Sequence, residues 1–251
     1  MAESAPQPRW PWPGIGLAAG YDRDGSRIDE IAGAGFDFVE FGTVTPHPEP
    51  NHNPGVAPLA SRLRAARGQG RFDRCGVGIS VGCSFQSQGD GVADDWRCAA
   101  EQAWPLLDFL VINLSAPYYR HLLQAAEPLG RQLERLGTAL PGDKPVLLKL
   151  PVGVPGLALP PWLHLLPEWG IRGMVVSQAA EGVAQAASLL RQLRHLLPGQ
   201  VLLSVGGIAS PQTLAQRLAA GADAVEVFTA YQSGGSDALA ALLALADLQP
   251  T

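Results

Sequence analysis

The sequence predicts a single-domain (β/α)₈ barrel, and three observations support this prediction. The chain has 251 residues, close to the ~250 that are typical of this fold. Eight short apolar runs recur along its length, with helix-like segments between them. The runs are nearly continuous in Val, Ile, Leu and Phe, as in parallel strands that are buried on both faces. Eight such runs favour a closed barrel over a doubly wound open sheet, which usually has fewer strands at this length.

The apolar runs give the positions of the expected elements. The expected strands are Gly14–Gly20, Phe36–Gly42, Cys75–Gly82, Leu107–Ser115, Pro145–Val152, Gly173–Gln178, Val201–Gly207 and Ala224–Tyr231. Amphipathic helices are expected at Asp94–Leu106, Gln124–Leu140 and Pro211–Ala220. The segment Pro46–Arg74 begins with a Pro-, Asn- and His-rich loop, which we expect to cross the barrel mouth. Residues 1–13 form an N-terminal extension, and its Trp10 and Trp12 are expected to cover the barrel bottom.

The composition excludes several classes of protein. Hydrophobic residues make up 47% of the chain and charged residues 16%, so one large core is expected across residues 1–251. The net charge of −5 and the lack of a basic run argue against nucleic acid as a partner. The sequence has no 18-residue apolar span and no secretory signal, so no membrane partner is expected. Three cysteines without CxxC spacing indicate free thiols and a cytoplasmic location. A homodimer is compatible with the sequence.

Chemistry in such a barrel is expected at the carboxyl ends of the strands. Gly206-Gly207 ends the seventh run, and Phe228-Thr229 lies near the end of the eighth. Glycines let a backbone approach a phosphate closely, and these two loops are the usual phosphate site of the fold, although a glycine pair can also form only a tight turn. Lys149 lies within an apolar strand, where a buried ammonium needs a partner. We therefore expect an anionic or electron-rich partner inside the barrel; a lysine that snorkels to solvent is the alternative.

These motifs together resemble the flavin site of dihydroorotate dehydrogenases, especially the class 2 branch. Gly16–Asp22 reads GLAAGYD and Gly35–Pro46 reads GFDFVEFGTVTP, where the family has AAGFDK and FVEIGTVTP. Leu110–Ser115 and Lys149 also match, and the matches follow the family order from about residue 14 to residue 231. The resemblance implies non-covalent FMN at the barrel mouth. The implied cofactor-binding residues are Ala18, Ala19, Gly20, Thr43, Ser80, Asn113, Lys149, Ser177, Gly206, Gly207, Phe228 and Thr229.

The sequence departs from the family at the substrate side. The family run NxSSPN, which carries the serine base of class 2 enzymes, reads NLSAPY at Asn113–Tyr118, so the base position is Ala116. The family's substrate loop between Pro54 and Arg74 is missing, and Ala179–Ala187 replaces a longer phosphate-contacting loop. The implied substrate-binding positions are Arg23, Asn113, Tyr118 and Gln178. Loss of a positioned base typically costs about two to four orders of magnitude in rate, so dihydroorotate oxidation is not expected.

Two residues are candidates for replacement chemistry. Cys83 follows the third strand, and its thiol is an acid, base or nucleophile if its pKa is lowered; an inert buried thiol is the alternative. Tyr118 lies just beyond the fourth strand, next to Tyr119, and its phenol is a candidate general acid. The alternative is that both rings only fill space. His47 and His52 are expected to be surface loop residues, and no metal-ligand spacing is present.

Three functions remain open at this point. The first is an FMN-dependent oxidoreductase that acts on a small molecule other than dihydroorotate, in specialised metabolism. The second is a catalytically inactive relative that serves as a binding or scaffold protein. The third is a non-redox phosphate-binding barrel such as an isomerase or aldolase, which uses Lys149 but lacks a matching carboxylate at a neighbouring strand end. The absorption spectrum of the purified protein separates the first function from the second.

Overall fold

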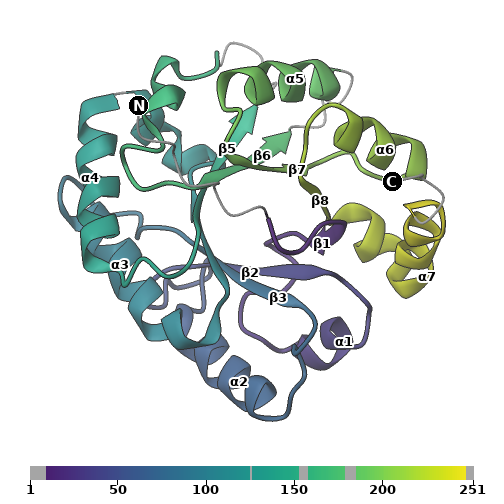
Figure 1. Cartoon of the computed structure of the whole chain (residues 1–251). Coiled ribbons are helices and arrows are strands. Elements are labelled where there is room, and N and C mark those ends of the chain that lie inside the picture. Colours follow the sequence, from purple (N-terminus) through teal and green to yellow (C-terminus); the bar gives the residue numbers. More distant parts are fainter. Residues whose placement is uncertain (1–9, 125, 153–157, 179–184, 247–251) are drawn as a thin grey trace.

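The fold prediction is confirmed by the computed structural model, which describes residues 10–124, 126–152, 158–178 and 185–246. Eight parallel strands close in chain order, because β1 pairs with β2 on one side and with β8 on the other. Figure 1 shows the strands at the centre and the helices around them. The strands are β1 (Ile15–Leu17), β2 (Phe38–Val44), β3 (Gly76–Val81), β4 (Phe109–Asn113), β5 (Val146–Val152), β6 (Gly173–Gln178), β7 (Val201–Val205) and β8 (Ala224–Val227).

The outer layer consists of α-helices and short 3₁₀ segments. The helices are α1 (Ile28–Ala32), α2 (Val56–Gly68), α3 (Gly91–Ala103), α4 (Ala126–Ala139), α5 (Ala186–Leu196), α6 (Pro211–Ala219) and α7 (Thr229–Ala246). The 3₁₀ segments are η1 (Trp104–Leu106), η2 (Pro117–Gln124) and η3 (Pro161–Leu165). Their apolar faces pack on the strands to form the main core, which includes the fully buried Trp96. Within the described part of the chain, no helix combines the length and apolar character needed to cross a bilayer.

Six of the eight expected strand ends differ from those of the structure. The eighth strand was expected to continue to Tyr231, but it ends at Val227 and Thr229 begins α7, where the Gln232 N–H donates to the Phe228 carbonyl at 2.8 Å. The second strand extends beyond its expected end and includes Thr43. An apolar run does not distinguish a buried strand from the first turn of a buried helix, which explains the error after Val227.

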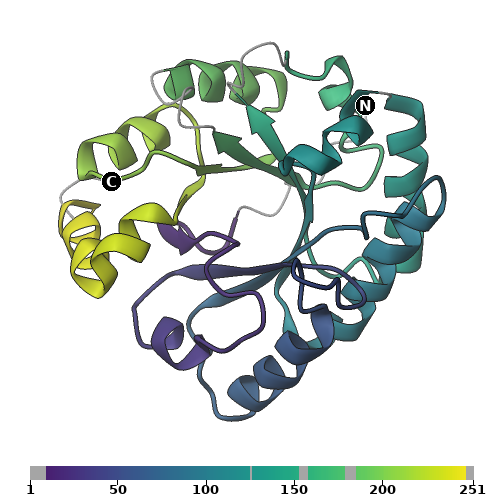
Figure 2. The same cartoon turned by 180° about the vertical axis from the view of Figure 1, so that it is seen from behind.

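The barrel interior is closed at the bottom by aromatic rings. Figure 2 shows the backbone of the barrel from the side opposite to that of Figure 1. The Trp10 ring packs edge-on against Phe38 at 5.3 Å and Phe109 at 5.0 Å between ring centroids. Room for these rings comes from glycines, because a Cβ on Gly16 would lie 2.3 Å from the Phe38 ring and one on Gly78 would lie 2.1 Å from the Phe109 ring. The prediction that the tryptophan segment covers the barrel bottom is therefore confirmed. The opposite end of the barrel is left for a site.

Candidate active site at the barrel mouth

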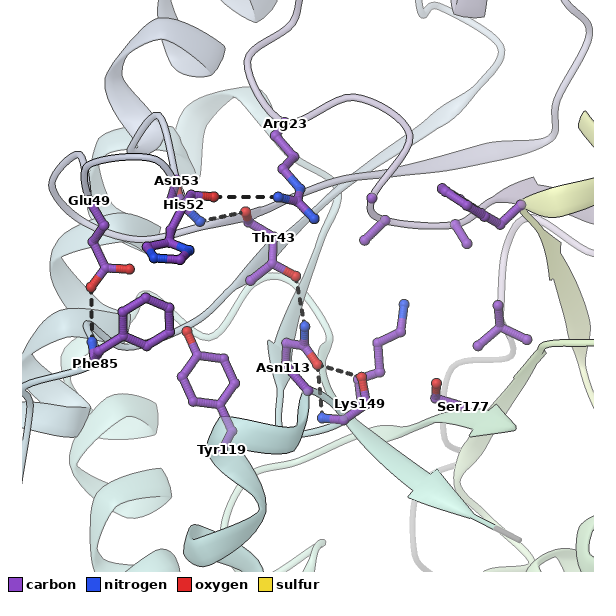
Figure 3. A pocket seen from close by; sticks show the side chains of 17 residues that line it. Arg23, Thr43, Glu49, His52, Asn53, Phe85, Asn113, Tyr119, Lys149 and Ser177 are labelled. Carbon is purple, nitrogen blue, oxygen red and sulfur yellow. Dashed lines mark hydrogen bonds between the residues drawn. The ribbon is translucent and has the colours of Figure 1, made fainter. Parts of the chain in front are cut away.

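A cavity of about 450 Å³ opens at the carboxyl ends of the strands, within the size range of ligand pockets. Figure 3 shows that its side chains come from many elements around the mouth. The lining residues are Ala18, Ala19, Gly20, Arg23, Thr43, Glu49, His52, Asn53, Phe85, Asn113, Ser115, Ala116, Tyr119, Lys149, Ser177, Val205 and Phe228. Most of the residues predicted to bind a cofactor therefore line one cavity.

A chain of hydrogen bonds fixes the polar wall of this cavity. The Asn113 side-chain amide donates to Thr43 Oγ1 at 2.7 Å (Figure 3). Thr43 Oγ1 also lies 3.0 Å from Ser80 Oγ. Asn113 Oδ1 accepts from both the backbone N–H (2.9 Å) and the hydroxyl (2.7 Å) of Ser115. Ser80 is fully buried behind Thr43 and does not line the cavity. The network holds Thr43 and Asn113 in fixed orientations at the ends of β2 and β4.

The loop after β1 is organised by a buried carboxylate. Asp22 is 4% exposed, and its oxygens accept hydrogen bonds from the backbone N–H groups of Gly25 at 2.7 Å and Arg27 at 2.9 Å. This turn presents Arg23 at the cavity rim, where its guanidinium donates to the His52 carbonyl at 3.4 Å. Arg23 is exposed, so its charge is available to an incoming ligand.

The adjoining part of the rim comes from the loops after β2 and β3. The Phe85 ring is 48% exposed and packs edge-on against the His52 ring, with 5.2 Å between centroids. The Phe85 backbone N–H donates to the Glu49 carboxylate at 2.9 Å. These contacts join the two loops over the cavity, in agreement with the expectation that the loop beginning at Pro46 crosses the mouth. His52 lines this cavity, although the sequence indicated an ordinary surface position.

A buried ion-pair triad lies beneath the cavity floor. Lys149 Nζ lies 2.7 Å from Glu40 Oε2 and 3.7 Å from Glu226 Oε2. The two glutamates come from β2 and β8, and both carboxylates are fully buried. The prediction that Lys149 has an anionic partner inside the barrel is confirmed. Glu40 and Glu226 were missed, although each stands within an apolar strand as Lys149 does and carries the same sequence signal.

The triad has one carboxylate more than it has ammonium groups, and Glu226 bears the excess. Neither of its oxygens has a hydrogen-bond partner within the described chain. Burial and the nearby Glu40 carboxylate raise the pKa of Glu226 well above its usual value, more than Lys149 lowers it. Burial alone disfavours the Lys149 ammonium, but the two carboxylates outweigh it and raise the pKa of Lys149. The folded barrel therefore favours a protonated Glu226 beside a charged Lys149.

We expect Glu226→Gln to stabilise the protein near neutral pH, and the gain to grow as the pH rises from 5 to 8. Because the pKa of Glu226 is raised on folding, its contribution is most favourable below the unfolded pKa of about 4.3 and is lost as the pH rises toward the folded pKa, at about 1.4 kcal/mol per pH unit. A neutral amide of the same size removes this loss. Urea unfolding between pH 5 and pH 8 measures it, with the exposed Glu168→Gln as control. If the free energies of unfolding of the wild type and of Glu226→Gln change in parallel with pH, Glu226 is not protonated in the folded protein.

A second cavity, of about 540 Å³, lies beside the first and shares Val205 and Phe228 with it. Gly206, Gly207 and Thr229 all line it. The predicted phosphate site requires these residues to lie around one space, and they do. Gly206 has a φ of +104°, and a Cβ there would lie 2.4 Å from the Gln178 carbonyl oxygen. This turn is therefore built for glycine, and it leaves backbone close to the open space. Glu226 also lines this cavity.

The remaining predicted site residues take different positions. Cys83 is buried and outside both cavities, and burial, with a smaller effect from Asp95, raises the pKa of its thiol to about 12. This thiol is a poor acid or base at neutral pH. Gln178 lines the second cavity instead of the first. The Tyr118 side chain lies outside the described residues, whereas Ala116 lines the first cavity beside Asn113.

Tyr119 lies near the start of η2 and has a structural role. Its hydroxyl donates to the Cys83 carbonyl at 2.6 Å, and a Cβ on Gly82 would lie 2.0 Å from that hydroxyl. The ring therefore ties the segment after β4 to the end of β3 and closes one side of the first cavity. Among the described residues, no group of three or more metal-ligating side chains is present.

Comparisons with known proteins agree with this geometry. No protein-family model matches the chain. The dihydroorotate dehydrogenase (quinone) of Mycobacterium ulcerans is 31% identical over 90% of this chain and 74% of its own length. The Flavobacterium lutescens enzyme of the same name is 28% identical over 86% of this chain and 75% of its own length.

The fold comparison gives the same result. The crystal structure of DHODH from Eimeria tenella in complex with ferulenol has a TM-score of 0.75 and 21% identity, over 91% of this chain and 78% of that chain. The ligand-free form of the same protein has a TM-score of 0.73 and 22% identity, over 91% of this chain and 81% of that chain. These structures establish the shared barrel, and the sequence identity to the mycobacterial enzyme establishes the relationship. The chain belongs to the dihydroorotate dehydrogenase family.

Proposed function

We propose that this chain binds FMN at the barrel mouth and catalyses the oxidation or reduction of a small molecule other than dihydroorotate. The observation that carries the proposal is the pair of adjoining cavities, one with Lys149 at its floor and one with Gly206 and Gly207 in its wall. The family membership supports a flavin oxidoreductase. Its curated relatives are dihydroorotate dehydrogenases of the quinone type, and the change of substrate is our proposal.

The residues present fit FMN in chemistry and in space. A Cβ at Gly206 would collide with the Gln178 carbonyl, so only glycine permits the turn that brings this backbone into the wall of the second cavity, where a phosphate could lie against it. Ala18, Ala19 and Gly20 give the first cavity a wall of small side chains suited to a flat ring. Gly20 faces Phe228, whose ring would lie 3.3 Å from a Cβ at that position. Larger residues at Ala18, Ala19 and Gly20 would fill the space that the flavin ring requires.

Bound FMN would supply a centre that accepts or donates two electrons. The chain's own residues bind and orient it: Thr43 and Asn113 are held by their hydrogen bonds, and Lys149 offers a positive charge from the cavity floor. The Glu40 partner keeps this ammonium charged and limits its reach. With Cys83 buried and its thiol pKa about 12, we assign the proton-donating role to Tyr118.

We expect no dihydroorotate-dependent flavin reduction in the wild type or in Ala116→Ser. Ala116 lines the cavity where the family resemblance places the base, and its methyl group carries no exchangeable proton. A serine alone works only if the substrate is held within about 2.6–3.2 Å of it, and misplacement by ~1 Å costs about a hundredfold. Anaerobic mixing with dihydroorotate, followed by the flavin absorbance, measures this. Reduction in Ala116→Ser but not in the wild type would mean that the substrate pocket is intact and only the base is lost.

The absorption spectrum of the purified protein tests the proposal as a whole. We expect a flavin spectrum, and release of FMN, identified by its mass, on denaturation. Protein reconstituted with FMN should regain the spectrum if the cofactor is lost during purification. A colourless protein that does not take up FMN would instead support the alternative of a catalytically inactive binding or scaffold protein.

A further inference from the structure

Arg217 is one of the largest fully buried side chains among the described residues, and no sequence pattern indicated it. It lies on α6 and is only 2% exposed. Its guanidinium donates to the Gln178 side-chain carbonyl, to Ser204 Oγ at 3.4 Å and to the Gly206 carbonyl at 3.1 Å. Two of these three partners, Gln178 and Gly206, line the second cavity. Arg217 therefore stands directly behind the wall of that cavity.

The charge of Arg217 is not balanced by any acid in the described part of the chain. Its three partners are neutral oxygens, and no described carboxylate lies within 4.0 Å of it. Two less buried arginines form ion pairs with acidic side chains: Arg67 with Asp108, and Arg194 with Asp223 at 2.7 Å. Burial lowers the pKa of Arg217, but an arginine stays protonated in proteins. A buried cation without a counter-ion is costly, which points to an anion that arrives from outside the chain.

The hydrogen bond to Gly206 also orients the glycine turn. In a trans peptide the C=O and N–H point in opposite directions. Because the Gly206 carbonyl is directed at Arg217, the Gly207 N–H of the same peptide is directed away from it. The positive φ angles of both glycines, +104° and +68°, belong to this conformation. One guanidinium thus both fixes the turn and places a positive charge behind it.

We propose that Arg217 is the positioning residue and buried counter-charge for a phosphate monoester bound against Gly206 and Gly207. The inference rests on the proposed function, because the phosphate of FMN is such an anion. In the low-dielectric interior, a cation acts on an anion through the peptide between them with less screening than in water. Arg217 therefore selects the phosphate, and the flavin ring is held by other residues.

The test compares FMN with riboflavin, which has the same ring and ribityl chain but no phosphate. We expect Arg217→Gln to weaken FMN binding by roughly 10- to 100-fold, the range for a hydrogen bond that involves charge, and to leave riboflavin binding unchanged. Arg217→Lys retains a positive charge and should restore much of the preference for FMN. Arg194→Gln is the matched control, because Arg194 holds Gly221 and Asp223 at the opposite ends of the strands. Equal loss of both flavins in Arg217→Gln would show a purely structural role and overturn the proposal.

A second measurement keeps the inference independent of variant folding and of the flavin. We expect inorganic phosphate to raise the thermal midpoint of the flavin-free wild type above that in chloride at equal ionic strength, and not to raise that of Arg217→Gln. A wild type without a phosphate response would overturn the role of Arg217 even if FMN binds. A wild type that binds neither flavin but responds to phosphate would contradict the proposed function and leave the anion site supported.

Discussion

In the Gly207→Asp variant, FMN affinity is expected to fall by roughly 100- to 1,000-fold while the barrel remains folded. Gly207 is exposed in the wall of the second cavity, and an aspartate there would place a negative charge where the phosphate is proposed to bind. Two like charges about 4 Å apart near a protein surface repel by about 4 kcal/mol, which corresponds to a loss of this size. Fluorescence titration of the flavin-free protein with FMN measures the change.

The matched control for this variant is Gly142→Asp. Gly142 has a φ of +75°, close to the +68° of Gly207, and a Cβ there would have no atom within 4 Å. It precedes β5 and therefore lies at the end of the barrel away from the mouth. The control adds the same charge at the same backbone cost, and it should leave FMN affinity unchanged. Equal FMN affinity in the two variants would place the phosphate elsewhere.

Lys149→Met is expected to lower the free energy of unfolding by about 3–5 kcal/mol at neutral pH, the cost of breaking a buried ion pair on one side. Glu40 and Glu226 would remain buried without their shared cation. The deficit relative to the wild type should shrink toward pH 5, because the folded variant must bind protons that the wild type does not need. Urea unfolding at several pH values measures both effects.

Two further variants separate charge from packing at this position. Lys144→Met removes a partly exposed lysine before β5, and it should cost far less. The double variant Lys149→Met with Glu226→Gln should recover part of the lost stability, because one buried carboxylate is gone. If the double variant is no more stable than Lys149→Met, the loss comes from the shape of the methionine and not from uncompensated charge.

The barrel could be predicted because every strand is buried on both faces. Such strands need continuous apolar sequence, and β6 and β7 accordingly begin where their apolar runs begin. The end of β8 could not be predicted in the same way. Phe228, Ala230 and Tyr231 are apolar in sequence, yet Phe228 lies beyond the strand and the other two lie in the first turn of α7. There Tyr231 packs edge-on against Phe36 with 4.9 Å between ring centroids. This contact joins distant parts of the chain and leaves no mark on the local pattern.

The grouping of the site residues followed from topology. Thr43, Asn113 and Lys149 lie at or near the carboxyl ends of parallel strands, and a closed barrel brings those ends to one mouth. Topology does not determine which side chains each site residue contacts, because these contacts also depend on how the loops and helices pack. Cys83 also follows a strand, but Tyr119 covers this region and the thiol is buried.

The sequence alone determined the fold class, the end of the barrel that bears the site, and the need of Lys149 for an anion. These properties depend on residue type and on strand order, which can both be read along the chain. Only the tertiary structure decided that the anion is Glu40, that Glu226 is a second buried acid beside Lys149, and that Arg217 stands behind Gly206. Those contacts join residues 109, 77 and 11 positions apart. They arise from the closure of the barrel and the packing of α6, which fix which side chains meet across the interior.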